Sequence, residues 1–293
     1  IMKKVKFFNF IVCLLLVMAG CNDDDNLPSR KNEFDLRKIN YQTHFTNPYD
    51  TIGKYHNEAL AYVFKEYFKS PAAKSSQNAK EKLSKLIVDF MNKKPFAEGV
   101  KITEKDIQKM ESRVQAKSSN NQLFNSDKQR KYYKNLKDKV RKDKHSSPQD
   151  LISSINKLEK QVAESDLPES EQAQLLIGMS VAKYSSVFWM EQIKNMESQA
   201  KTTNAIPEEE MYDGDWNRWF ESFLSKAEEI FWADVEGGIG GFATSFIFID
   251  YKGLLIPGMG LATIQAAMGY VVSFAIGASA WQGIKILWNI VFE

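Results

Sequence analysis

The chain has 293 residues, 43% of them apolar, which is enough for one large hydrophobic core or two smaller ones. Its formal net charge is only +2, so a large overall charge that would bind polyanions is excluded. The two cysteines, Cys13 and Cys21, both lie near the N-terminus, which excludes a disulfide framework, a CxxC redox site and a cysteine-ligated zinc.

Residues 1–21 have the pattern of an export signal, with early lysines followed by an apolar core from Phe7 to Met18. The ending Met18-Ala19-Gly20-Cys21 resembles the bacterial lipobox, in which the cysteine is acylated. We therefore expect Cys21 to carry lipid chains that anchor the protein in a membrane. The alternative is an ordinary signal peptide with a chance cysteine.

Residues 22–46 are predominantly polar and are predicted to form a tether. The tether opens with Asn22-Asp23-Asp24-Asp25-Asn26. This acidic run resembles the signal that sends lipoproteins of Bacteroidota to the outer face of the outer membrane. The resemblance implies a lipid-anchored outer-membrane protein displayed at the cell surface.

Residues 47–200 carry apolar side chains at helical spacing, and no segment alternates with period two for long. The sequence therefore predicts an all-α fold, with a helical bundle in this region. Proline and capping signals place the expected helices from Tyr55 to before Pro71, over 78–93, from Thr103 onward, over 149–165 and from after Pro168 to about Gln199.

Residues 128–144 hold nine Lys or Arg and two Asp. We interpret this segment as a solvated helix face, with attraction to anionic lipid headgroups as the second interpretation. Tyr132 and Tyr133 among the basic residues could indicate a nucleic-acid surface. We expect no nucleic-acid partner, because an exported, anchored protein seldom meets cytoplasmic nucleic acid.

An acidic linker over 201–214 separates the bundle from a C-terminal unit, 215–293. This unit begins with an amphipathic helix whose aromatic face starts with Trp216 and Trp219. Such a face packs on a core or lies at a membrane interface, where Trp is favoured. Trp281 and Trp288 at the far end would suit the same interface.

Small residues recur four apart in the remainder of this unit, which places each set on one helix face like a glycine zipper. The sets are Gly237, Gly241 and Ser245; Ala262 and Ala266; and Gly269, Ser273 and Gly277. With a turn at 250–258 they predict a Gly-rich apolar helical hairpin. The run 253–284 is uncharged and longer than the roughly 20 residues that span a bilayer. A buried hairpin and a membrane-inserting hairpin both remain open.

His56, Asn57 and Glu58 form the one polar cluster that looks positioned for a function. His56 and Glu58 lie on different sides of a helix, so a role in capping or satisfying the helix start is favoured over a ligand or catalytic role. The sequence holds none of the common hydrolase, zinc-protease, phosphate-binding or dinucleotide-binding motifs. We expect no enzyme activity, no cofactor and no metal.

Three short blocks resemble a group of uncharacterised Bacteroidota surface lipoproteins. They are Asn47-Pro48-Tyr49-Asp50 with Gly53 and His56 to Leu60; Ala182 to Ser186 with Phe188-Trp189; and Ala233 to Gly241. Members of the group often end in a Gly/Ala segment like that of membrane-active bacteriocins. No activity comes with the resemblance. Two functions are therefore carried forward. The first is a non-enzymatic surface protein that acts by protein or membrane interaction through its Gly-rich hairpin. The second is a membrane-active effector whose hairpin inserts into a target bilayer.

Overall fold

The computed structural model describes residues 36–69, 79–94, 102–108, 123–143, 145–202, 216–245 and 275–276. The regular structure in these residues is helical throughout and contains no strand, which confirms the all-α prediction. The principal elements are η1 (Leu36–Lys38), α2 (Asp50–Lys69), α3 (Ala79–Lys93), α5 (Asp127–Arg141), α6 (Pro148–Ala163), α7 (Glu169–Thr202) and α8 (Trp216–Ser245).

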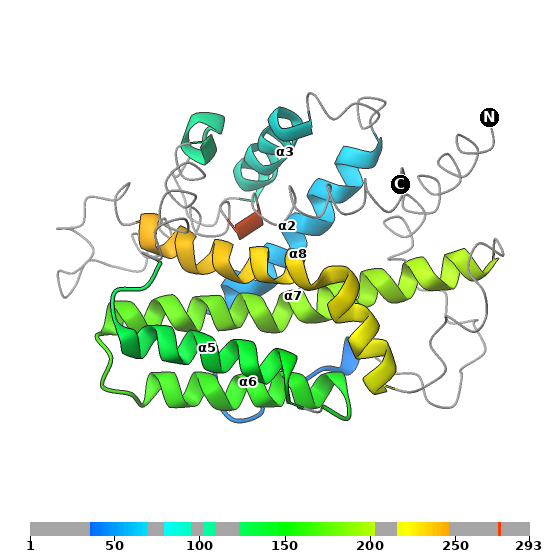
Figure 1. Ribbon diagram of the computed structural model, residues 1–293. Helices are drawn as coiled ribbons and strands as arrows, with labels where there is room; N and C mark the ends of the chain where they lie inside the picture. The colour runs from blue at the N-terminus through cyan, green and yellow to red at the C-terminus, as the bar shows by residue number, and fades with distance from the viewer. Residues whose placement is uncertain are drawn as a thin grey trace.

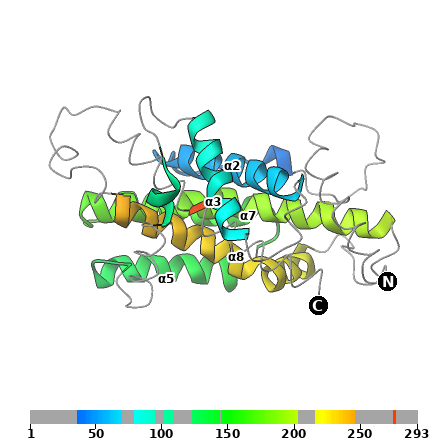
Figure 2. The same ribbon diagram turned by 90° about the horizontal axis from the view of Figure 1, so that it is seen from above.

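Helix α7 runs through the centre of the fold, and α2, α5, α6 and α8 pack against it (Figures 1 and 2). Helix α3 lies on α2, and α5 lies on α6. From Leu175 to Met190 every side chain of α7 is buried except that of Tyr184, which is half-buried. A helix enclosed on all sides must find partners inside the protein for its polar side chains.

Capping residues explain where α5 and α6 begin. The hydroxyl oxygens of Ser126 and Ser147 accept hydrogen bonds from the backbone N–H groups of Gln129 and Asp150, respectively. Pro148 occupies the first turn of α6, where its missing N–H costs nothing. These local signals are readable in the sequence, and the helices start where the signals lie.

Helix α2 begins at Asp50, earlier than the start expected at Tyr55. The Asn47 side-chain oxygen accepts from the N–H of Tyr49 at 2.9 Å, and its backbone oxygen accepts from the N–H of Asp50 at 3.1 Å. These bonds carry the turn directly into the helix. Residues 50–53 of the segment predicted as a lead-in therefore form the first turn of α2, and residues 47–49 make the turn before it.

Two glycines let α7 and α8 cross at short range. A Cβ atom added to Gly178 of α7 would lie 2.5 Å from Cγ1 of Ile239, and one added to Gly238 of α8 would lie 3.0 Å from Cγ2 of Val181. Any larger side chain at Gly178 would therefore push the helices apart. Gly238 of α8 thus faces another helix of the same chain, whereas the predicted packing face was that of Gly237 and Gly241.

The predicted division between an aromatic helix and a separate hairpin arm differs from what the structure shows. Trp216 and Trp219 lie in the same continuous helix, α8, as Gly237 and Gly241. Both glycines are buried, and α8 ends at Ser245. Since α8 packs on α7, its described part belongs to the same core as the predicted bundle.

Several predicted residues lie outside the described part of the chain: Cys21, Ala262, Ala266, Gly269, Ser273, Gly277, Trp281 and Trp288. Ala275 and Ile276, between two of the predicted small residues, are described and are buried and helical. Among the described residues, the helices include none with the length and apolar character needed to cross a bilayer.

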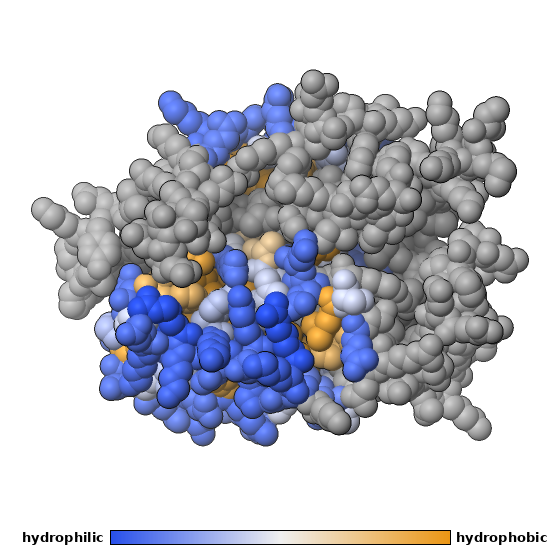
Figure 3. Space-filling model, viewed as in Figure 1, coloured by the Kyte–Doolittle hydropathy of each residue, from blue (hydrophilic) through white to orange (hydrophobic). Residues whose placement is uncertain are grey.

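The face formed by α5 and α6 is strongly hydrophilic (Figure 3). Part of the basic segment predicted to face solvent nevertheless binds α8. Lys137 Nζ lies 3.4 Å from Oε1 of Glu236, and Arg141 pairs with Glu228. Both cations also lie over the ring of Trp232. The basic residues thus help to fasten α5 to α8, and these carboxylates reduce the free positive charge of this face.

Candidate functional site

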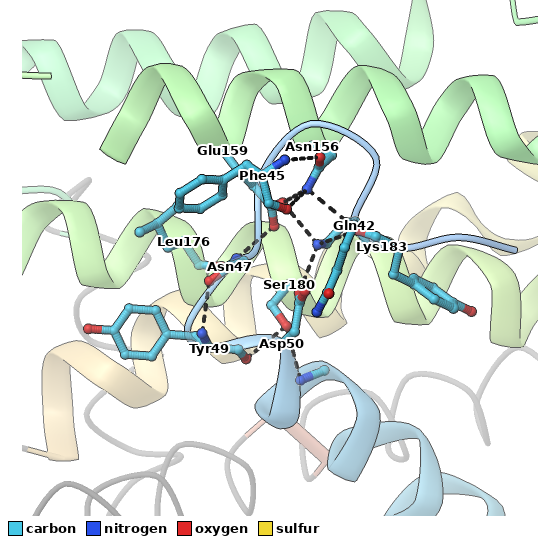
Figure 4. A network of polar contacts seen from close by, with 12 residues as sticks. Gln42, Phe45, Asn47, Tyr49, Asp50, Asn156, Glu159, Leu176, Ser180 and Lys183 are labelled. Atoms are coloured by element: carbon cyan, nitrogen blue, oxygen red, sulfur yellow. Dashed lines mark hydrogen bonds and ion pairs between the residues drawn. The ribbon is translucent and has the colours of Figure 1, made fainter. Parts of the chain in front are cut away.

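A buried group that we call the lysine cluster comprises Lys183, Asp50, Glu159 and Asn47, contributed by α7, α2, α6 and the turn before α2 (Figure 4). Lys183 Nζ lies 2.7 Å from Oδ1 of Asp50 and 2.9 Å from Oε2 of Glu159. It also donates to the backbone oxygen of Tyr41 at 3.1 Å. The side chains of Lys183 and Glu159 are fully buried. One positive and two acidic groups are therefore held together away from water.

Two asparagines complete the surroundings of Glu159. Asn47 Nδ2 donates to Oε1 of Glu159 at 2.7 Å, and Asn156 Nδ2 donates to Oε2 at 2.8 Å. The side-chain oxygen of Asn156 accepts from the backbone N–H groups of His44 and Phe45. The segment before α2 is thereby fixed onto α6.

Desolvation by burial raises the pKa of Glu159 from 4.5 to about 7, although Lys183 and Asn47 act in the opposite direction. This result follows from the low polarisability of the interior, which penalises the ionised carboxylate. Asp50 lies on the other side of the Lys183 ammonium and further disfavours a second negative charge. Burial thus favours the protonated, uncharged form of the Glu159 carboxyl.

Helix α2 approaches α7 closely beside this cluster. A Cβ atom on Gly53 would lie 2.6 Å from the backbone oxygen of Ser180, so only glycine fits here without a shift. The Gly53 N–H donates to the Ser180 hydroxyl oxygen at 3.2 Å, and that hydroxyl donates to the backbone oxygen of Tyr49 at 3.0 Å. The close approach keeps Asp50, at the start of α2, within reach of Lys183.

A second buried group, the histidine cluster, comprises His56, Asp234, Ser185 and Trp189 and joins α2, α8 and α7. His56 Nε2 lies 3.9 Å from Oδ1 of Asp234. The Trp189 indole N–H donates to Oδ2 of Asp234 at 2.8 Å, and the Ser185 hydroxyl donates to the same oxygen. His56 and Asp234 are fully buried, so Asp234 is the polar link between three helices.

Burial lowers the pKa of His56 from its ordinary 6.5. Asp234, the Asn57 side chain and a hydrogen bond with the backbone of Ala275 all oppose this change. His56 Nδ1 lies 3.2 Å from Oδ1 of Asn57, whose amide donates to the backbone oxygen of Tyr184 at 2.7 Å. The C-terminal apolar segment therefore touches the histidine cluster at Ala275.

The structure separates the predicted polar residues. His56 and Asn57 point into the core, whereas Glu58 pairs with Lys94 at 3.1 Å on the surface. His56 lies in the second turn of α2 and not at its start, so the expected capping role is wrong. The Ser185 hydroxyl donates to Asp234, an arrangement that differs from a serine nucleophile activated by histidine. The described residues contain no group of three or more His, Cys, Asp or Glu side chains suited to a metal ion.

Sequence reasoning missed Lys183, Asp50, Glu159 and Asp234 as site residues. A signal was present: Lys183 and Glu159 occupy positions that helical periodicity assigns to the buried faces of their helices. A charged residue at a core position needs a buried partner of opposite charge. That rule would have identified both residues, although not the partners that they share.

Comparisons of the chain with protein-family models, with curated proteins and with solved structures find no match. The three sequence blocks 47–60, 182–189 and 233–241 meet in the fold. The first block supplies Asp50 and His56, the second supplies Lys183 and Ser185, and the third supplies Asp234. The two buried clusters are built almost wholly from these blocks.

Proposed function

We propose that the protein is a non-enzymatic, lipid-anchored protein of the cell envelope that acts at the cell surface by binding a protein partner. The observation that carries this proposal is the crossing of α7 and α8, where Gly178 receives Ile239 and Gly238 receives Val181. At this crossing Gly238 of α8 serves packing within the chain. On this proposal, the outer face of the helical bundle is what remains for a partner.

Two further features support the proposal. Within the lysine cluster, and likewise within the histidine cluster, the polar side chains contact one another and are shielded from solvent. This arrangement suits a structural role better than turnover of a substrate. The sequence Ala19-Gly20-Cys21 followed by the acidic run 22–26 supports attachment by lipid and display at the surface. We expect no cofactor, metal or nucleic-acid partner.

Fractionation of cells that express the full chain tests the anchor. The wild-type chain should be in the outer-membrane fraction, and external protease should degrade it in intact cells. Cys21→Ser should release the protein, whereas Cys13→Ser should not, because Cys13 lies within the predicted signal. A wild-type chain that stays soluble, or that external protease never reaches, would overturn the proposed location.

The second candidate function is a membrane-active effector. The observation that favours it is the packing of the C-terminal apolar segment against the core. Ala275 and Ile276 are fully buried, and the backbone of Ala275 forms a hydrogen bond with His56. On this candidate function, loss of the contact between His56 and Ala275 would help to release the segment. Release of dye from liposomes of stated lipid composition separates the two functions. Leakage caused by the purified full chain, and lost in Gly241→Leu, would favour the effector.

A further inference from the structure

We propose that Lys183 and Asp50 become joined by an intramolecular amide bond, and that Glu159 moves the protons during its formation. The bond would link the side chain of α7 to that of α2 and would be a self-made covalent modification. Its reactants are the side chains themselves, so no cofactor or second substrate is required. The inference is independent of where the protein resides and what it binds.

The geometry places the reacting groups together before any reaction. Lys183 Nζ is 2.7 Å from Oδ1 of Asp50 and 2.9 Å from Oε2 of Glu159. Helices on three sides hold these side chains, and the close α2–α7 contact at Gly53 keeps Asp50 in position. Groups fixed at contact distance react as if at very high concentration.

Burial favours the product over the reactants. Lys183 and Glu159 are fully buried, and the Asp50 side chain is only 8% exposed. An ion pair in such surroundings bears a desolvation cost that a neutral amide does not. Water released by the reaction would leave a dry site, and its scarcity there would oppose hydrolysis of the amide.

The reaction balances as ammonium plus carboxylate giving amide plus water. A proton passes from Lys183 Nζ to the Asp50 carboxylate, which leaves a neutral amine and a carboxylic acid. The nitrogen lone pair then attacks Cγ of Asp50, and the C–N bond forms. Glu159 takes a second proton from Nζ and delivers it to the departing hydroxyl oxygen. The Cγ–O bond breaks, water leaves, and Glu159 returns to its starting state.

Glu159 suits this task for two reasons. Asn47 and Asn156 hold its two oxygens at 2.7 and 2.8 Å, which fixes the carboxyl group toward Lys183 (Figure 4). Its pKa of about 7 allows it both to accept and to release a proton near neutral pH. A carboxylate with an ordinary pKa would accept the proton less readily.

Peptide mapping of the purified full chain tests the proposal. Trypsin cleaves after Lys or Arg, so Asp50 lies in fragment 39–54 and cleavage at Lys183 separates 161–183 from 184–194. The amide would block cleavage at Lys183. The digest of the denatured protein should then contain 161–194 joined to 39–54, at a mass one water below the sum of the two fragments.

Two matched variants locate the proton carrier. Glu159→Gln should yield the separate, unmodified fragments while retaining a helical circular dichroism spectrum. Glu236→Gln removes another lysine-paired glutamate, 3.4 Å from Lys137, and should keep the joined fragment. If Glu159→Gln does not fold, the wild-type digest decides alone. Fragments 39–54 and 161–183 at their unmodified masses in folded wild-type protein would overturn the proposal, and a joined fragment in Glu159→Gln would remove Glu159 from the reaction.

Discussion

Gly178 of α7 and Ile239 of α8 pack so closely that a Cβ atom added to Gly178 would lie 2.5 Å from Cγ1 of Ile239. Real Cβ atoms essentially never come so near, so the two helices depend on this pairing for their separation. The fit also explains why a glycine is tolerated inside a long helix, where it costs up to about 1 kcal/mol relative to alanine.

The first prediction concerns this pairing. Gly178→Ala should lower the free energy of unfolding by about 1–3 kcal/mol, because overpacking outweighs the gain in helix propensity. In a chain that already carries Ile239→Ala the same substitution should cost less, because the Cγ1 and Cδ1 atoms that the new methyl group would meet are absent. Urea unfolding of the four members of this cycle measures the coupling. Equal costs in both backgrounds would show that Ile239 does not set the helix separation.

The second prediction concerns Asp234. Asp234→Ala should destabilise the fold by about 2–5 kcal/mol, because it leaves the Trp189 N–H and the Ser185 hydroxyl buried without their acceptor. Asp234→Asn keeps one oxygen acceptor and should cost less. Thermal and urea unfolding followed by circular dichroism give both values. A loss from Asp234→Ala no larger than that of an exposed substitution would contradict the role assigned to this carboxylate.

The third prediction contrasts a surface pair with this buried group. Glu228 binds Arg141 at the edge of the fold, where the two side chains are 33% and 45% exposed. Solvent screens such a pair, so Glu228→Gln should cost only about 0–1 kcal/mol. The cost should shrink further as salt is added. A large loss that does not depend on salt would mean that the pair is far better shielded than its exposure indicates.

The fourth prediction concerns pH and His56. Burial lowers the pKa of His56 in the folded protein below 6.5, whereas the unfolded chain keeps the ordinary value. Below pH 6.5 the unfolded state therefore binds more protons than the folded state, and stability should fall as the pH falls toward the folded pKa. His56→Gln should remove this part of the pH dependence.

Urea unfolding of the wild-type chain and of His56→Gln, above and below pH 6.5, checks the sign. The neighbours of His56 are Asp234 from α8, Asn57 from α2 and the backbone of Ala275. Glu159 affects the pH dependence of stability in the opposite direction. Its pKa is about 7 in the folded protein and 4.5 in the unfolded chain, so its contribution to stability is lost as the pH rises between these values. The difference between the two chains isolates His56. A curve unchanged by His56→Gln would contradict the prediction.

Local patterns predicted much of the helical architecture. The register of Leu151, Ile155 and Val162 on α6 appears as a buried face, because helical periodicity depends only on nearby residues. The capping serine before α6 and the proline in its first turn were equally local. Such features need no knowledge of the partner helix, and they determine where a helix begins and which side faces the core.

The helix crossing shows where local patterns stop. The spacing of Gly237 and Gly241 indicated one packing face, yet the glycine that meets Val181 is Gly238, the next residue along and about 100° around the helix. Its counterpart, Gly178, is the only glycine of α7, and its four-residue spacing to Ala182 and Ser186 does not reveal which helix it meets. Complementarity between two helices distant in sequence decides this contact, and neither helix reveals it alone.

The lysine cluster had the same origin. Lys183 required an acid, but its two acids come from residue 50 in one helix and residue 159 in another. The sequence offers 37 acidic residues, and spacing along the chain does not choose among them. Burying an ammonium group without an acidic partner costs so much free energy that the sequence predicts a partner for Lys183. The tertiary fold then decides that the partners are Asp50 and Glu159.

In the lysine cluster Lys183, Asp50 and Glu159 depend on one another, and this has a consequence for how the sequence can evolve. Loss of Lys183 alone would leave two buried carboxyl groups without their cation. Loss of either carboxyl group would leave Lys183 with only one acidic partner. Substitution at one position is therefore expected to persist only with compensating changes at the others. Positions 50, 159 and 183 should covary among homologous chains. Their joint occurrence offers a marker for recognising distant relatives whose overall sequences have diverged.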